Sequence, residues 1–254
     1  MNELFDLSKK VAIVTGGSGG IGKALAVGLA KHGADVVVTS RTLSKLEPVA
    51  VEIQALGRKA IAVPCDVTDE GSVQDMVNRV VQEFSHIDIL VNAHGINIRN
   101  SAEDMPIDDW KKVIDFNVAG IFICCQAVGR VMIKEKSGKI VNVSSVRGRY
   151  GAPSGAVAYS PSKGAVDTLT RTLACEWAKY NVFVNAVAPT LIETDLTRQA
   201  LANPEFAKTM RARIPLGRWG FPEDVVGPTV FLASKASDFV TGQIIYVDGG
   251  TTTW

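Results

Sequence analysis

The sequence has few of the residues that form metal sites and disulfides. It contains four cysteines and three histidines in 254 residues. No two cysteines form a C-x-x-C pair, and the histidines show no ligand spacing (Cys65, Cys124, Cys125 and Cys175; His32, His86 and His94). We therefore expect free thiols in a reducing compartment and no metal site.

An excess of charge of one sign is also lacking. The 27 Lys and Arg residues nearly balance the 26 Asp and Glu residues, for a net charge of +1, and no basic block stands out. Binding to nucleic acid requires a concentrated positive surface, so we expect no nucleic-acid partner. The balance favours a small-molecule substrate as the partner.

Long hydrophobic runs are missing as well. Residues 1–10 carry Glu3 and Asp6 and lack the apolar core of a signal peptide. No later apolar run approaches the roughly 20 residues of a membrane span. We therefore predict a cytoplasmic protein with no membrane partner. Because no repeat, low-complexity segment or Pro/Gly-rich linker divides the chain, residues 1–254 are predicted to form a single domain.

Short β-branched runs alternate with amphipathic segments along the chain. Strands are predicted at 11–14, 35–39, 60–63, 87–91, 139–143, 182–185 and 243–247, and helices at about 21–32, 44–56, 70–84, 106–116, 118–136, 159–178 and 225–233. This α/β pattern is typical of a parallel sheet with helices on both faces, whose ligands bind at the carboxyl ends of the strands. The less regular residues 189–213 are predicted to form a mobile lid.

The first predicted strand is followed by a cluster of glycines. Thr15, Gly16, Gly20 and Gly22 satisfy T-G-x-x-x-G-x-G, and a second register, G-x-G-x-x-G, begins at Gly17. We prefer the first register because it begins where the strand ends. Such glycines let the backbone approach a pyrophosphate, which binds to the free N–H groups at the start of the next helix. The cluster predicts dinucleotide binding, with a plain flexible turn as the alternative.

The end of the second predicted strand indicates which dinucleotide is bound. A carboxylate usually binds the ribose 2′-hydroxyl there, but this strand ends in Thr39, Ser40 and Arg41. A guanidinium pairs with a 2′-phosphate and Ser40 can donate to it, so NADP is favoured over NAD. Alternatively, Arg41 is a solvated helix-start residue. Asp66, after the third strand, is placed either to accept from the adenine amine or to cap the following helix.

Tyr159 and Lys163 form the main catalytic candidate. They stand at i and i+4 of a predicted helix, which puts a phenol and an ammonium group on one face. A neighbouring positive charge lowers the pKa of a phenol, which would make Tyr159 a usable proton carrier. The same spacing also occurs by chance in helices, so the prediction depends on the surrounding motifs.

Several motifs in order resemble the short-chain dehydrogenase/reductase family over essentially the whole chain. They are Thr15-Gly16-x-x-x-Gly20-Ile21-Gly22, Asp66-Val67, the Asn117 helix, Ser145, Tyr159-x-x-x-Lys163, Asn185-Ala186-Val187-Ala188-Pro189 and Val247-Asp248-Gly249-Gly250. The resemblance implies a single-domain, doubly wound Rossmann fold with a seven-stranded parallel sheet, usually in a homotetramer. It also implies hydride transfer between a nicotinamide cofactor and a carbinol or carbonyl carbon.

The resemblance assigns roles to individual residues. The catalytic set is Asn117, Ser145, Tyr159 and Lys163: Tyr159 transfers the proton, Lys163 lowers its pKa and binds the nicotinamide ribose, Ser145 holds the substrate oxygen, and Asn117 holds a water. The expected cofactor-binding set adds Gly16, Ser18, Gly20, Ile21, Gly22, Ser40, Arg41, Asp66, Val67, Asn92, Gly95, Pro189, Ile192 and Thr194 to Tyr159 and Lys163.

The sequence departs from the family pattern near the substrate site. Asn92-Ala93-His94-Gly95 stands in place of N-N-A-G, Pro189-Thr190 in place of P-G, and the 145–159 loop is one residue longer. The first change puts an imidazole near the expected nicotinamide end. Segments such as Gly95-Ile96-Asn97-Ile98-Arg99 look like the gluconate 5-dehydrogenase and keto-deoxygluconate dehydrogenase branch.

A sugar acid needs a cation for its carboxylate and polar groups for its hydroxyls. The candidate substrate-binding residues are His94, Arg99 and Arg147, with Ser145 and Tyr159, and Asn97 and Arg149 could also contribute, although each arginine could instead be a surface or interface residue. Two alternatives remain open. One is a 3-oxoacyl thioester (acyl carrier protein) reductase, and the other is a regulator that senses NADP without turnover.

Overall fold

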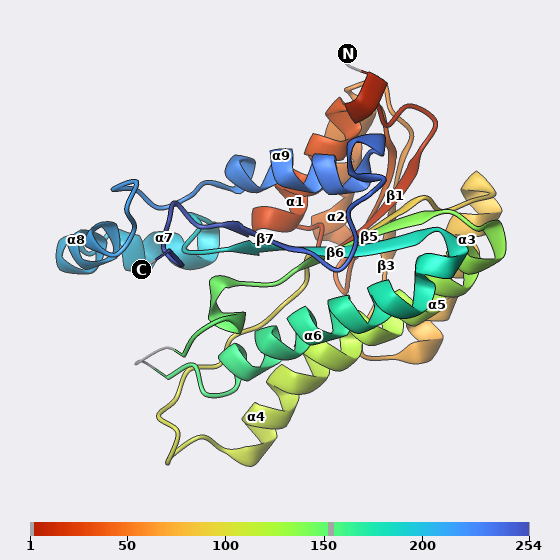
Figure 1. The fold of residues 1–254 in the computed structure, drawn as a ribbon. Helices are drawn as coiled ribbons and strands as arrows, with labels where there is room; N and C mark the ends of the chain where they lie inside the picture. The colour runs from red at the N-terminus through yellow and green to blue at the C-terminus, as the bar shows by residue number, and fades with distance from the viewer. Residues whose placement is uncertain (1–2, 152–154, 254) are drawn as a thin grey trace.

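The β-branched runs form one parallel sheet. The computed structural model describes residues 3–151 and 155–253, and in that part of the chain seven strands pair in the order β3-β2-β1-β4-β5-β6-β7 (Figure 1). The strands are β1 Val11–Thr15, β2 Asp35–Ser40, β3 Ala60–Pro64, β4 Ile89–Asn92, β5 Gly138–Val143, β6 Val182–Pro189 and β7 Ile244–Val247. Every pairing is parallel, which confirms the predicted Rossmann-type fold class.

Helices cover both faces of this sheet. They are α1 Gly20–Lys31, α2 Leu43–Gln54, α3 Glu70–Phe84, α4 Ile107–Ile114, α5 Gly120–Glu135, α6 Tyr159–Trp177, α7 Asp195–Leu201, α8 Pro204–Ala212 and α9 Pro222–Ala233. One apolar cluster lies under α1, α2 and α9, and a second lies under α3, α5 and α6. Figure 1 shows α1 and α9 on one side of the sheet and α5 and α6 on the other.

Short 3₁₀ segments complete the fold. They are Glu3–Phe5, Val146–Gly148, Ala178–Tyr180 and Lys235–Ser237. Residues 152–154, in the loop predicted to be one residue longer, lie outside the described part of the chain, as do residues 1 and 2 of the predicted N-terminal stretch.

The predicted break between two helices at Asn117 is a π-helical turn. Residues Asp115–Ala119 join α4 to α5 without interruption. The Asn117 amide accepts from Ile96 N at 2.8 Å and donates to Ile96 O at 2.9 Å. Its side chain therefore satisfies both backbone groups of Ile96, as a neighbouring strand would. A π turn accommodates one extra residue and turns this side chain toward the loop, which local sequence patterns do not predict.

The helix that α4, the π turn and α5 form together is long and apolar. Residues 107–135 form a helix of 29 residues, and an 18-residue stretch of it has a mean hydropathy of 1.7, so by length and composition alone it could cross a membrane. Several of its buried residues belong to the second apolar cluster, among them Ile121, Cys124, Cys125, Val128 and Met132. The segment is therefore a core helix of this fold.

The predicted lid is more regular than expected. Residues 189–213 contain α7 and α8 instead of an irregular segment. A capping box formed by Thr194 and Thr197 starts α7, and Asn203 caps α8 by accepting from Glu205 N and Phe206 N. The mobility of this segment remains a prediction.

Candidate active site

The proposed catalytic residues gather at the carboxyl edge of the sheet. Tyr159 begins α6, and Lys163 follows one turn later with its Nζ 5.7 Å from the centroid of the Tyr159 ring. Asn117 Nδ2 donates to Ser162 Oγ at 3.0 Å, which ties the π turn to α6. The Cβ of an alanine at Gly95 would lie 3.5 Å from Lys163 Nζ and 3.6 Å from Asn117 Oδ1, so Gly95 separates these two side chains.

Lys163 is buried and is bonded to the sheet. Its Nζ donates to the carbonyl of Val143, at the end of β5, at 2.8 Å. Burial lowers the pKa of Lys163 to about 8, although the nearby Asp167 carboxylate acts in the opposite direction. As the pH rises from 7 toward 8, a growing fraction of the Lys163 amine therefore loses its proton.

The expected lowering of the Tyr159 pKa is wrong for this structure. Burial raises the pKa of the phenol, and the neighbouring Ser145 hydroxyl and Arg147 guanidinium offset only part of that shift. Desolvation of the phenol is the dominant effect. The Lys163 ammonium group, from which the lowering was expected, donates to the Val143 carbonyl. The three side chains of Tyr159, Ser145 and Arg147 nevertheless lie together.

Ser145 follows β5 and is held by backbone on both sides. Its Oγ accepts from Arg147 N at 3.2 Å and donates to the Pro189 carbonyl at 3.4 Å. The first bond starts the 3₁₀ turn that carries Arg147. Thus Pro189, predicted as a cofactor residue, supports Ser145 through its carbonyl.

A buried carboxylate behind this site was missed from the sequence. Asp167 lies on α6, one turn after Lys163, and its Oδ1 accepts from Ser144 Oγ at 2.5 Å. Burial raises the pKa of Asp167. The Ser144 hydrogen bond and the charges of Arg171 and Lys163 act in the opposite direction but are smaller effects. The i+4 spacing after Lys163 was a usable signal, but it does not distinguish a buried acid from a solvated one.

The glycine turn has the shape that a pyrophosphate requires. Gly16 and Gly20 have φ values of +69° and +51°, in the left-handed region. A Cβ at Gly22 would lie 2.2 Å from the Gly16 carbonyl oxygen, so the turn folds tightly onto α1. No side chain caps α1 at Gly19, which has open space beside it. The free N–H groups at the start of α1 therefore fit an anionic group.

The other glycine-turn candidates surround the same helix start. Ser18 and Ile21 lie in the turn and its first helical residues. Thr194 approaches from the predicted lid, since a Cβ at Gly20 would lie 3.3 Å from Thr194 Cγ2. Ile192 is buried and forms an isolated bridge to Gly220, which anchors this segment.

The Asn92 side chain is bonded to other buried side chains instead of facing a ligand. Its side chain is buried and donates to Asn142 Oδ1 at 2.9 Å and to Cys125 Sγ at 3.3 Å. Asn142 donates in turn to Thr170 Oγ1 at 3.0 Å. The amide therefore joins β4 to β5 and to helix α5, and the side chain is not free to bind the cofactor.

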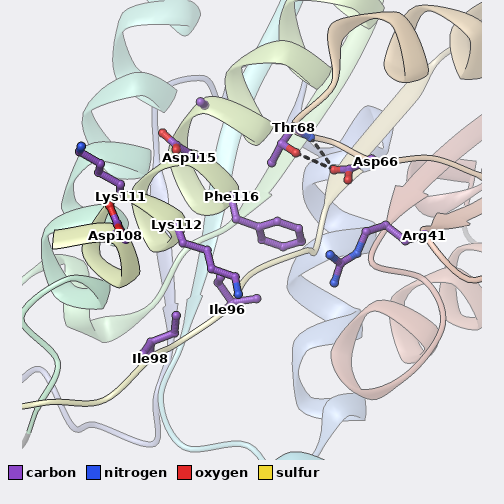
Figure 2. Close-up of a pocket in the computed structure, with 11 residues that line it drawn as sticks. Arg41, Asp66, Thr68, Ile96, Ile98, Asp108, Lys111, Lys112, Asp115 and Phe116 are labelled. Atoms are coloured by element: carbon purple, nitrogen blue, oxygen red, sulfur yellow. Dashed lines mark hydrogen bonds between the residues drawn. The ribbon is translucent and has the colours of Figure 1, made fainter. Parts of the chain in front are cut away.

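A pocket of about 830 Å³ lies beyond the ends of β2 and β3. Figure 2 shows Arg41 on one wall and Phe116 and Ile96 on the other. The Oγ of Ser40 is buried at the pocket end of β2 and has no hydrogen-bond partner among the described residues. A cation beside an unpartnered hydroxyl fits a phosphorylated adenosine ribose.

Asp66 borders this pocket, and one of its two predicted roles is wrong. Its Oδ1 accepts from Thr68 N at 3.0 Å and from Thr68 Oγ1 at 2.7 Å. These two bonds lower the pKa of Asp66, and the bond from the Thr68 backbone has the larger effect. The cap of α3 is Asp69, which accepts from Ser72 N, so the predicted capping role of Asp66 is wrong. Val67 is buried beside Gly120.

The structure does not bring His94 together with the substrate candidates. Its ring is buried, its Nδ1 is 2.7 Å from Thr15 Oγ1, and it meets the Phe116 ring edge-on. Burial, with a contribution from Lys163, lowers the pKa of His94 to about 3. A neutral interior imidazole supplies no charge to a carboxylate, which corrects the expected role.

This burial predicts a pH effect on stability. The unfolded histidine takes up a proton below its usual pKa of about 6.5, whereas the folded one stays neutral down to about pH 3, so stability falls with pH in that window. Between pH 7.5 and 5.0 we expect His94 to account for about 2 kcal/mol of lost unfolding free energy.

Urea unfolding of the wild type and of His94→Asn at both pH values measures this loss. The variant should lose about 2 kcal/mol less than the wild type on acidification. His86→Asn, at the protein surface, is the control. Equal acid losses in the wild type and in His94→Asn would contradict a buried neutral imidazole.

The three candidate arginines are placed differently. The Arg147 guanidinium donates from Nη1 to the Gly151 carbonyl at 3.3 Å and lies 5.3 Å from the Tyr150 ring centroid. Arg99 is exposed on the loop after β4 and makes no ion pair or hydrogen bond within residues 3–151 and 155–253. The guanidinium carbon of Arg149 lies 5.5 Å from the centroid of the Tyr246 ring.

Comparisons with known proteins agree with this geometry. A family profile described as enoyl-(acyl carrier protein) reductase matches residues 16–252. Gluconate 5-dehydrogenase of Gluconobacter oxydans is 42% identical over 250 residues, covering 98% of this chain and 97% of that protein. A 3-oxoacyl-[acyl-carrier-protein] reductase of Synechocystis is 43% identical over 246 residues, covering 96% and 97%.

A solved structure is similar over nearly its whole length. The gluconate 5-dehydrogenase from Burkholderia cenocepacia J2315, in complex with NADP and tartrate, has a TM-score of 0.95 and 37% identity, covering 99% of this chain and 98% of that one. The fold, the glycine turn and these relatives define a NAD(P)-dependent dehydrogenase/reductase acting on CH–OH groups. The chain belongs to the short-chain dehydrogenase/reductase family.

Proposed function

We propose that this enzyme uses NADP to interconvert a ketone and a secondary alcohol on a sugar acid or polyol, such as 5-ketogluconate and gluconate. The observation that carries the proposal is the position of Arg147, whose backbone N donates to Ser145 Oγ at 3.2 Å and which lies in the 3₁₀ turn that Ser145 begins. A guanidinium near the reacting carbon can bind a carboxylate in bidentate fashion. The gluconate 5-dehydrogenase relatives support the same class of substrate.

Each catalytic residue has a chemical role in this proposal. Tyr159 donates a proton to the carbonyl oxygen during reduction and accepts it during oxidation. Ser145 holds that oxygen as charge develops on it. Lys163 supplies positive charge one turn from the phenol, and Asn117 holds the water that connects Lys163 to solvent. The bound nicotinamide supplies or accepts the hydride.

The NADP proposal depends on the end of β2. The glycine turn binds the pyrophosphate with the N–H groups at the start of α1, and Ser40 and Arg41 bind the 2′-phosphate. The unpartnered Ser40 hydroxyl and the absence of an acid in Thr39-Ser40-Arg41 support this choice. Solved relatives bind NADP.

Two alternative functions remain. A 3-oxoacyl thioester reductase is favoured by the Synechocystis relative. An NADP-sensing regulator has no need of a proton carrier, so the grouping of Tyr159, Ser145 and Lys163 argues against it. We further propose that residues 1–254 act as one domain in a cytoplasmic homotetramer, with 189–213 as its lid.

The substrate assignment is tested by NADPH oxidation at 340 nm. The panel consists of 5-ketogluconate, 2-keto-3-deoxygluconate, simple ketoses and acetoacetyl thioesters, repeated with NADH. We expect turnover of a keto acid, with KM raised about tenfold or more in Arg147→Ala because a charge-assisted hydrogen bond is lost. Arg99→Ala tests the exposed candidate in the same way.

Arg149→Ala is the matched control, since Arg149 lies in the same loop but over Tyr246. Its KM should stay within about twofold of the wild-type value. Turnover of the thioester alone would replace the sugar-acid assignment with the reductase alternative. NADPH binding without any turnover would favour the sensor.

A further inference from the structure

A column of side chains joins the end of β1 to Arg41. Thr15 Oγ1 and His94 Nδ1 are 2.7 Å apart in the interior. The His94 and Phe116 rings meet edge to face, with centroids 5.4 Å apart and planes at 87°. The guanidinium carbon of Arg41 lies 5.6 Å from the Phe116 centroid, and Figure 2 shows the two side chains directed toward each other.

Each contact in the column restricts the next side chain. The buried bond to Thr15 fixes the His94 ring, and an edge-to-face contact fixes the orientation of a neighbouring ring. The face of Phe116 then attracts the guanidinium of Arg41. Arg41 makes no ion pair or hydrogen bond within residues 3–151 and 155–253, so its N–H donors remain free for a ligand.

Net charge does not explain selection of a phosphate in this pocket. Besides Arg41, the ionic side chains that line it are Lys111, Lys112, Asp66, Asp108 and Asp115, so three basic groups face three acidic ones. A 2′-phosphate is therefore not attracted by an excess of positive charge. Its recognition depends on where the guanidinium of Arg41 is held.

We propose that Phe116, held by His94, is a positioning residue that sets the specificity for NADP over NAD by orienting Arg41. The proposal rests on the NADP use proposed above. Phe116 acts through Arg41 and does not itself bind the phosphate. Removal of its aromatic face leaves Arg41 free to adopt many rotamers, which costs affinity only for a cofactor that carries the 2′-phosphate.

The alternative role for Phe116 is a floor beneath the adenine ring. In that case its loss weakens NADPH and NADH by the same factor, because both cofactors carry adenine. The ratio of the two dissociation constants separates these roles. Adenosine 2′,5′-bisphosphate and AMP make the same comparison without the nicotinamide half.

The experiment measures dissociation constants by fluorescence for NADPH and NADH and by calorimetry for the two fragments. In Phe116→Leu we expect the Kd for NADPH to rise about fivefold, the effect of losing a cation–π contact, with NADH changed less than about twofold. His94→Ala should shift the ratio in the same direction. Phe116→Tyr retains the ring face and should retain the wild-type ratio.

Two variants serve as controls. Phe122→Leu makes the same substitution at an exposed position of α5 and should leave both Kd values unchanged. Arg41→Ala tests the underlying cofactor assignment and should remove the preference for NADPH. If Phe116→Leu does not fold, His94→Ala and Phe116→Tyr provide the test.

The outcomes separate the two proposals. Equal weakening of NADPH and NADH in Phe116→Leu, or no change in either, overturns the role of Phe116 while the effect of Arg41→Ala keeps the NADP assignment. A wild-type protein without preference for NADPH, or an Arg41→Ala variant with an unchanged ratio, overturns both.

Discussion

Replacement of Tyr159 with phenylalanine should lower kcat about a thousandfold. The variant keeps the ring at the start of α6 but removes the hydroxyl that transfers the proton, and general acid or base catalysis contributes roughly 10²- to 10⁴-fold. Turnover of a substrate found in the panel measures the effect, and NADPH titration checks that the cofactor site is intact.

Tyr180→Phe is the matched control for this prediction, because Tyr180 lies in the 3₁₀ turn at the other end of α6. Its kcat should remain within about twofold of the wild-type value. If Tyr159→Phe retained wild-type turnover, the proton would have to come from another group, and the proposed roles of Ser145 and Lys163 would lose their basis.

Replacement of Gly22 with alanine should destabilise the protein by about 3 kcal/mol and abolish cofactor binding. The added Cβ would lie 2.2 Å from the Gly16 carbonyl oxygen and 2.7 Å from its carbon. Backbone atoms cannot avoid it by a change of rotamer, so the glycine turn must open. Ordinarily a change from Gly to Ala inside a helix is stabilising, which makes the sign of this effect informative.

Gly19→Ala is the control within the same turn. Gly19 has an extended backbone, with φ of −178°, and no atom lies within 4 Å of an added Cβ. Urea unfolding should show a loss of less than about 1 kcal/mol for this variant. A larger loss for Gly19→Ala than for Gly22→Ala would mean that the close approach of Gly22 to Gly16 does not constrain the turn.

The sequence predicted the parallel sheet and the glycine turn because both depend on local patterns. β-branched runs and the spacing of Thr15, Gly16 and Gly20 are visible without long-range information, and the strand bounds differ from the structure by a few residues. The positions of Tyr159 and Lys163 on one helix were equally predictable from their i, i+4 spacing.

Features that depend on contacts between distant segments were not predictable. His94, in the loop after β4, is bonded to Thr15 at the end of β1. The π turn at Asn117 places an amide that bonds the same loop at Ile96. The raised pKa of Tyr159 follows from desolvation of the phenol in the folded chain. None of these has a signature within one element.

The strand order has a consequence for how the chain folds during synthesis. β2 and then β3 add to one side of β1, and β4, β5, β6 and β7 add in turn to the other side. Each new strand therefore joins an edge that is already exposed, and no strand has to insert between two that are paired. The sheet can grow outward from β1 in the order in which the ribosome delivers it, before the C-terminal residues are made.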